Sequence, residues 1–279
     1  MSRIILIVVL IFFGNRKSLS QDTIYLNRDT SSIESVVFAK AAFNTSTNFN
    51  QNNLILNVPL NTSQELTIYN NDTITHLIAF PDGSPDEWIN PGTYFTKVIG
   101  GLNFGTYSIF SKTPQGELLG LGAIYRVAIN GLNFTWDLWE QDPLLTFQIA
   151  EGSTNNIPVY YRPSLFAING GVDPMDLTSS AALIGSVGDT ILLSIVNNGN
   201  MVHPIHFHGY HVEILQSTIQ SDRVGWKKDS FPVYVNEGMT VRLIPDKPGD
   251  YPVHNHNLVS TLFNNNYPKG MITMISIAP

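Results

Sequence analysis

The sequence of 279 residues contains no cysteine. A chain without thiols cannot form disulfides, iron–sulfur clusters, thiolate zinc sites or blue-copper centres, and it has no cysteine nucleophile. The folded protein must therefore depend on its hydrophobic core.

Apolar runs long enough to span a membrane are also absent, because the one strongly apolar run, residues 4–13, is too short. It follows the basic start Ser2-Arg3 and precedes the small residues around Ser20, an arrangement typical of export signals. We therefore expect a signal peptide at residues 1–20. The mature chain should be secreted or periplasmic, with no membrane attachment after signal removal.

Basic residues are scarce. The chain has 15 Lys and Arg against 22 Asp and Glu, and three of the basic residues lie in the segment 1–20, which leaves 12 against 22 and a net charge of −10. Nucleic acids and anionic membrane surfaces are bound by clusters of Lys and Arg. Neither is expected as a partner.

Helical periodicity is almost absent, and the chain instead repeats short runs rich in Val, Ile, Leu, Thr, Tyr and Phe between Gly, Pro, Asn and Asp clusters. Runs with this spacing predict an all-β protein built as a sandwich or barrel. The clearest runs are 54–60, 64–70, 94–99, 106–111, 123–129, 144–149, 190–196, 240–244 and 271–277.

The two halves of the sequence resemble each other. Each contains a strand ending in Asn-Asn, a histidine a few residues later, a turn, and a strand that begins Gly-x-Tyr. A repeat of this length indicates duplicated domains rather than a solenoid. We predict one domain over residues 21–140 and a second over residues 141–279.

Histidines are concentrated in the second half, which holds six of the seven. Four of them form two His-x-His pairs, His206 with His208 and His254 with His256. Residues two apart in a strand share a face. If the two strands are neighbours, four imidazoles converge on one patch, and an all-nitrogen donor set suits copper or zinc.

The remaining histidines are weaker candidates. His76 is isolated in the first half, and His211 is out of phase with His208. A lone histidine supplies a single ligand. We expect both to be ordinary core or surface residues.

The segment His203-Pro-Ile-His-Phe-His-Gly resembles a histidine signature of multicopper oxidases, the laccase family. Tyr251-Pro-Val-His-Asn-His, followed by Gly270-Met271, is similar to the closing signature of that family, and residues 162–170 resemble the start of its last domain. The resemblance is strongest over residues 161–279. It implies two tandem cupredoxin-like Greek-key β-sandwich domains, with eroded metal motifs in the first.

The resemblance also implies roles for single residues. His203 would be a ligand of the mononuclear blue copper and His206 a type-2 copper ligand. The coupled type-3 pair would use His208, His254 and His256.

The sequence departs from the family at several of these positions. The cysteine that ligates blue copper falls on Asn255, the next histidine on Ser260 and the axial methionine on Asn265, with an apparent insertion over residues 261–267. A blue-copper centre is therefore not expected, and His203 would be left without a metal partner. The trinuclear cluster of the family needs more histidines than the seven present.

Three functions remain open on the sequence alone. The chain could be a copper-binding protein with a histidine-only site and residual oxidoreductase activity. It could be an oxidase whose cluster is completed in a homo-oligomer or by a partner chain, acting on an unknown small molecule. It could also be a structural or binding module in which the histidines are relics.

Overall fold

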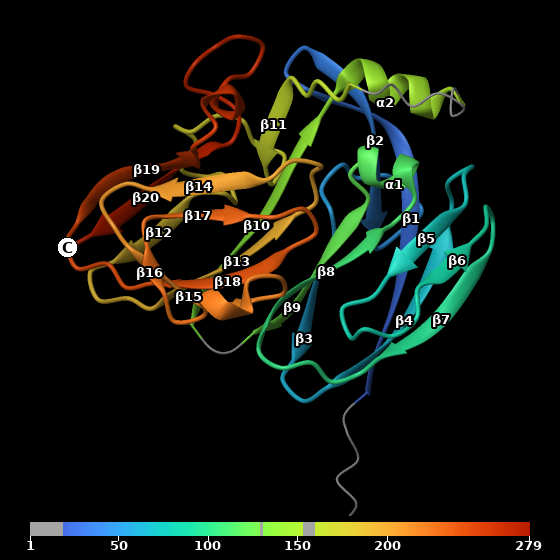
Figure 1. Cartoon of the computed structure of the whole chain (residues 1–279), viewed down its shortest axis with the longest axis horizontal. Coiled ribbons are helices and arrows are strands. Elements are labelled where there is room, and N and C mark those ends of the chain that lie inside the picture. Colours follow the sequence, from blue (N-terminus) through green and yellow to red (C-terminus); the bar gives the residue numbers. More distant parts are fainter. Residues whose placement is uncertain (1–18, 129–130, 153–159) are drawn as a thin grey trace, which may run out of the picture.

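The computed structural model describes residues 19–128, 131–152 and 160–279, and nearly all of the predicted signal peptide lies outside these residues. The described residues form two β-sandwiches that lie side by side (Figure 1), which confirms the predicted all-β, two-domain fold. None of the described helices is both long and apolar enough to cross a membrane.

The first sandwich consists of two sheets, one ordered β2-β1-β4-β7 and the other β3-β9-β8-β5-β6. Its strands are β1 (Leu19–Ile33), β2 (Val36–Asn44), β3 (Ile55–Pro59), β4 (Ser63–Asn70), β5 (His76–Ala79), β6 (Glu87–Ile89), β7 (Tyr94–Ile99), β8 (Gly105–Ser111) and β9 (Gly122–Ala128).

The second sandwich pairs the sheet β11-β10-β13-β18-β15-β16 with the sheet β12-β20-β19-β14-β17. Its strands are β10 (Leu132–Gln141), β11 (Leu165–Ile168), β12 (Leu183–Ser186), β13 (Ile191–Asn197), β14 (His203–Phe207), β15 (Val212–Ser217), β16 (Lys227–Lys228), β17 (Ser230–Val233), β18 (Gly238–Leu243), β19 (Gly249–Asn255) and β20 (Ile272–Ala278).

The change from the first sandwich to the second falls between β9 and β10. β10 pairs in parallel with β13, so the second sandwich begins at Leu132, ahead of the expected division between residues 140 and 141. The helix α2 (Pro143–Ala150) then returns to the first domain, where Leu145 and Ile149 join its core. The other helical segments are α1 (Pro114–Leu118), η1 (Ser221–Arg223) and η2 (Leu258–Thr261).

The burial pattern along a strand reflects how many faces of its sheet are covered. β4 buries every second residue, including Leu66 and Ile68, because one face of its sheet covers the core. β13 is buried along its whole length, as expected for a strand covered on both faces. Its outer face meets the first domain.

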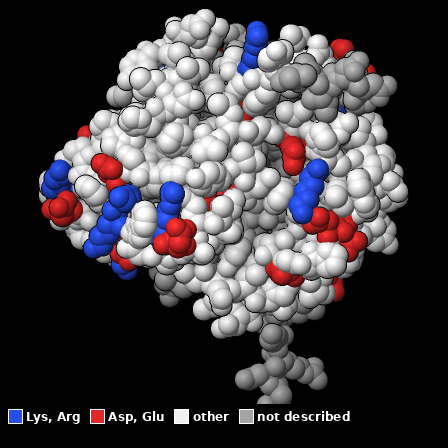
Figure 2. Space-filling view, viewed as in Figure 1, with Lys and Arg blue, Asp and Glu red and all other residues white. Residues whose placement is uncertain are grey.

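The two domains contact each other through polar side chains as well as apolar ones. Thr106 in β8 and Thr240 in β18 share a hydroxyl–hydroxyl hydrogen bond of 2.7 Å. A pocket of about 440 Å³ opens between the domains, and its lining includes Arg126 and Asp137 but none of the histidines. The face shown in Figure 2 carries few charges, and those of opposite sign are interspersed, so this face has no basic patch.

Candidate metal centre

The two strands that carry the His-x-His pairs are neighbours in one sheet. β14 pairs antiparallel with β19, and the register places His206 directly opposite His254. Directly opposed residues in an antiparallel pair have close Cβ atoms. Two of the four predicted ligands are therefore brought together by the backbone alone.

The alternation of β14 sets which side chains face the cluster. Ile205 and Phe207 point into the core of the second domain, while His206 points to the opposite face and is partly exposed. His208 and His254 are also partly exposed, and His256 is exposed. The four side chains thus share an accessible face of the sheet.

The four imidazole rings form a compact cluster. The ring centroid of His206 lies 4.6 Å from that of His208, 5.7 Å from that of His254 and 5.6 Å from that of His256. The centroid of His254 lies 5.1 Å from that of His208 and 6.1 Å from that of His256. The structure therefore brings all four side chains together.

In two of the rings, hydrogen bonds made by Nδ1 place the lone pair on Nε2, the nitrogen that could bind a metal. His206 donates from Nδ1 to the carbonyl oxygen of Asp229 at 3.2 Å, and the same atom lies 2.7 Å from the Ser230 hydroxyl. His254 donates from Nδ1 to the carbonyl oxygen of Asn255 at 2.9 Å. With the proton on Nδ1, each neutral ring carries its lone pair on Nε2, which is how ligand histidines are commonly oriented.

The cluster is not arranged as a finished coordination site. Within the described residues, no three His, Asp or Glu side chains could hold a metal ion as they stand. With Nδ1 of His254 protonated, Nε2 of His208 donates to Nε2 of His254 at 3.0 Å, whereas ligand nitrogens around a tetrahedral ion lie about 3.3 Å apart. The donor set fits copper or zinc, and the rings would have to turn to share one ion.

Electrostatics favour the neutral, ligand-competent form of one ring. Burial lowers the pKa of His208, and positive charge on His206, His254 or His256 would lower it further. Metal ions bind the neutral imidazole. Crowding of the four rings thus works in the direction that metal binding requires.

His203 does not join this cluster. It lies on the buried side of β14, where its Nε2 is 2.7 Å from Oε2 of Glu140 and its Nδ1 accepts a hydrogen bond of 2.8 Å from Nδ2 of Asn255. Both ring nitrogens are therefore engaged by protein groups. No local sequence pattern indicates Glu140 as a partner, because it lies on β10, 63 positions from His203.

The position that the resemblance assigns to blue copper does not fit that metal. Asn255 occupies the cysteine position, and its Nδ2 lies 3.3 Å from the sulfur of Met271. The methionine beside this site is therefore Met271, whereas Asn265, which was expected there, is exposed in a loop. A bridge between Phe263 and Asn266 closes the loop, which ends at Gly270.

The two weaker candidates also lie away from the cluster. His76 is buried in the first domain, and His211 lines a small pocket with Glu213 and Lys227. Neither ring contacts the four clustered histidines in the described part of the chain.

Comparison with known families gives a match to part of the chain. A family model described as "Multicopper oxidase" matches residues 145–262. A search of curated proteins found no match.

Solved structures match almost the whole chain. A multicopper oxidase named mgLAC is 15% identical with a TM-score of 0.76, and the match covers 94% of this chain and 88% of that one. A blue copper oxidase from Nitrosomonas europaea is 18% identical with a TM-score of 0.75, covering 93% and 86%. A copper nitrite reductase from Nitrosomonas europaea is 16% identical with a TM-score of 0.69, covering 94% of each chain.

At these identities the structural likeness establishes the fold, which is the predicted pair of tandem cupredoxin-like domains. The family match covers most of the second domain, where the histidine signatures lie. Residues 145–262 therefore match the multicopper oxidase family model, on a chain whose overall fold is that of two cupredoxin domains and which has no cysteine for blue copper.

Proposed function

We propose that this is a secreted copper-binding protein of the multicopper oxidase family, with a histidine-only site formed by His206, His208, His254 and His256. The observation that carries the proposal is the cluster of four rings, in which neighbouring centroids lie 4.6 to 6.1 Å apart, on an accessible face of the β14–β19 ladder. Four polar rings have little structural purpose at one point of a surface. An imidazole set without thiolate suits copper, and zinc is the second choice.

Oxidoreductase activity would be limited by the loss of the thiolate. The blue-copper cysteine is the usual electron path between a substrate and the oxygen-reducing cluster of the family, and Asn255 cannot supply it. We therefore assign copper binding as the primary function. Redox turnover at the histidine site would be a residual activity.

Copper loading tests the proposal directly. The metal-free protein is incubated with Cu²⁺, desalted and analysed for copper and by electron paramagnetic resonance. We expect about one or two copper ions per chain in a nitrogen-rich site, without an intense blue colour. The double variant His206→Ala/His256→Ala should lose this copper, and the control His211→Ala should retain it. Equal copper in the double variant and the unaltered protein would overturn the proposal.

A complete oxidase would need ligands from a second chain. At the positions of the first domain that match His206 and His254, the opposed pair is Ala79 and Phe110. A homo-oligomer that juxtaposes two four-histidine clusters, or a partner chain, would have to supply the rest. Oxygen consumption by the copper-loaded protein, with its oligomeric state measured in parallel, tests this arrangement.

A non-catalytic scaffold with relic histidines is the second candidate. It is favoured by one observation, that no three donor side chains of the described residues share a coordination point. In that case copper would neither bind after loading nor raise the melting temperature. The variants His206→Ala/His256→Ala and His211→Ala would then both behave like the unaltered protein.

A further inference from the structure

The surroundings of His203 in the second domain are repeated around His76 in the first. In each domain the residue two positions after the histidine lies opposite one particular residue of the neighbouring strand, which is Ser111 in β8 and Asn255 in β19. His76 and Ser111 are thus the counterparts of His203 and Asn255.

The loop before each histidine has the same hydrogen bonds. The side chains of Asn70 and Asn197 each donate from Nδ2 to the carbonyl oxygen four residues later, at 2.9 and 2.7 Å. Each also donates to the carbonyl of the residue opposite the histidine, at 3.1 and 3.0 Å. Oδ1 of each accepts the backbone N–H two residues later at 2.9 Å. The two loops are therefore built alike.

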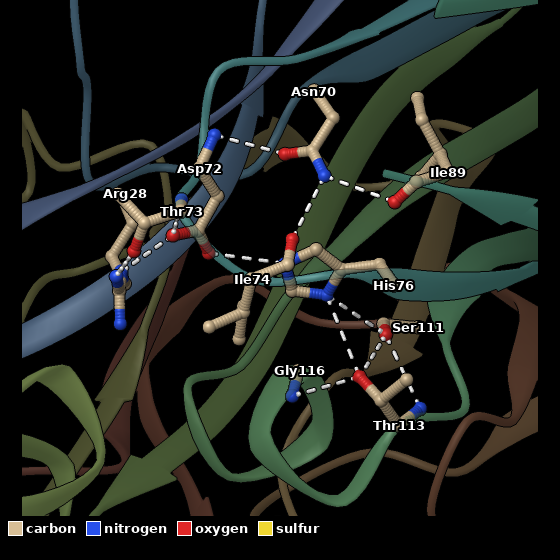
Figure 3. Close-up of polar contacts among 10 residues, drawn as sticks. All are labelled: Arg28, Asn70, Asp72, Thr73, Ile74, His76, Ile89, Ser111, Thr113 and Gly116. Atoms are coloured by element: carbon tan, nitrogen blue, oxygen red, sulfur yellow. Dashed lines mark hydrogen bonds and ion pairs between the residues drawn. The ribbon is translucent and has the colours of Figure 1, made fainter. Parts of the chain in front are cut away.

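The two histidines are bonded in the same sense. Figure 3 shows His76 with Nε2 facing Asp72 and Nδ1 facing Ser111; Nε2 is 3.0 Å from Oδ2 of Asp72, Nδ1 is 3.2 Å from the hydroxyl of Ser111, and all three side chains are buried. As in His203, the proton that faces the carboxylate is on Nε2, and Nδ1 accepts. Each domain thus contains a chain of an acid, a histidine and a polar side chain.

The acid comes from different places in the two domains but reaches the same point. In the first domain it is Asp72. At the matching position of the second domain stands Gly199, where a Cβ would lie 2.0 Å from Oε2 of Glu140. The next backbone N–H donates to the acid in both cases, Thr73 to Asp72 at 2.5 Å and Asn200 to Glu140 at 2.6 Å. The glycine leaves room for a carboxylate supplied by β10.

We infer that the second domain carries a metal-free series of acid, histidine and polar side chain where the family resemblance puts blue copper, that the first domain carries the same series at the equivalent position, and that His203 is not a metal ligand. Both nitrogens of each ring are occupied by protein groups. The first domain keeps the chain although Ala79 and Phe110 replace the clustered histidines. The hydrogen-bonded acid, histidine and polar side chain therefore hold the paired strands of each sandwich together independently of the four-histidine cluster.

Moving the acid tests this equivalence. Gly199 does not have a positive φ, so aspartate is compatible with its backbone. We expect Glu140→Ala to lower the equilibrium constant for folding roughly ten- to hundredfold, because it leaves His203 and the N–H of Asn200 unpaired. The double variant Glu140→Ala/Gly199→Asp should recover most of that loss, whereas Gly199→Asp alone should destabilise the protein. A double variant no more stable than Glu140→Ala would overturn the inference.

Two further measurements do not depend on whether Glu140→Ala folds. In the unaltered protein, ring ¹⁵N shifts should show His203 neutral with its proton on Nε2, unchanged when Zn²⁺ is added. His203→Gln should bind as much copper as the unaltered protein. A change in the His203 shifts with Zn²⁺, or the loss of one copper ion in His203→Gln, would make His203 a ligand and refute the inference.

Discussion

Gly238 in β18 lies so close to the backbone of Thr106 in β8 that a Cβ at residue 238 would stand 2.3 Å from the Thr106 carbonyl oxygen. This approach lies at the contact between the two domains, next to the hydrogen bond of Thr106 with Thr240. The crowded atoms are backbone, so a rotamer change cannot relieve the contact. The domains therefore fit together through a position where only glycine is accommodated.

Gly238→Ala should accordingly separate β18 from β8. We expect a loss of about 1–3 kcal/mol in the free energy of unfolding, measured by urea denaturation. Gly100→Ala is the matched control, because a Cβ there meets only Oδ2 of Asp82 at 3.9 Å. Equal stability of the two variants would show that the domains adjust to each other without cost.

Gly270 is the second glycine at which an alanine should be costly. It has a φ of +88°, and a Cβ there would lie 2.6 Å from the carbonyl oxygen of Ser260 and 2.8 Å from that of Leu262. Gly270→Ala therefore combines a left-handed backbone with a backbone clash, and we expect it to destabilise the protein by roughly 2–4 kcal/mol. Because Gly270 returns the chain to Met271, near-ultraviolet circular dichroism should show a local change as well. Gly188→Ala, with a similar φ and open space, isolates the backbone contribution.

Much of the candidate site could be read from the sequence because strands have a period of two. That period places His206 and His208 on the same side of one segment and His254 and His256 on the same side of the other. The four side chains then meet if β14 and β19 are neighbours, as they are. The same period places His203 on the opposite, buried face of β14, so its separation from the other four follows from geometry available in advance.

Other features depend on contacts that no local pattern records. Glu140 reaches His203 from β10, through space left by a glycine far along the chain. Met271 occupies the place assigned to Asn265, because the insertion loops out and rejoins the strand later than a simple count predicts. The start of the second domain at Leu132 depends on a parallel pairing with β13, which sequence periodicity cannot specify.

Ser230 should influence copper affinity without binding copper. Its hydroxyl lies 2.7 Å from Nδ1 of His206 and helps to hold that ring with Nε2 available. Partners of this kind typically contribute about 10–100-fold to metal affinity. We expect Ser230→Ala to weaken Cu²⁺ binding about tenfold, since the carbonyl of Asp229 still accepts from the same nitrogen. Competition titration with a chelator measures the change, and the exposed Ser221→Ala serves as the control.

Because of Lys40, the free energy of unfolding should change with pH in the alkaline range. Its side chain is fully buried in β2, where Nζ donates to the carbonyl oxygen of Gly120 at 3.0 Å and lies 5.0 Å from the Trp139 ring centroid. Burial lowers the pKa of Lys40 from 10.5 to about 8, although the nearby carboxylate of Asp137 opposes part of this shift.

The direction of the effect follows from the protons bound in each state. Below pH 8 the amine of Lys40 is charged in both states, and the cost of burying it is present in full. Between pH 8 and 10.5 the folded protein releases a proton that the unfolded chain still holds, so the free energy of unfolding rises with pH, by at most about 3 kcal/mol. Urea denaturation at pH 7.5, 9 and 10 should show this rise, and Lys40→Met should remove it. A variant with the same pH dependence as the unaltered protein would mean that another group releases the proton.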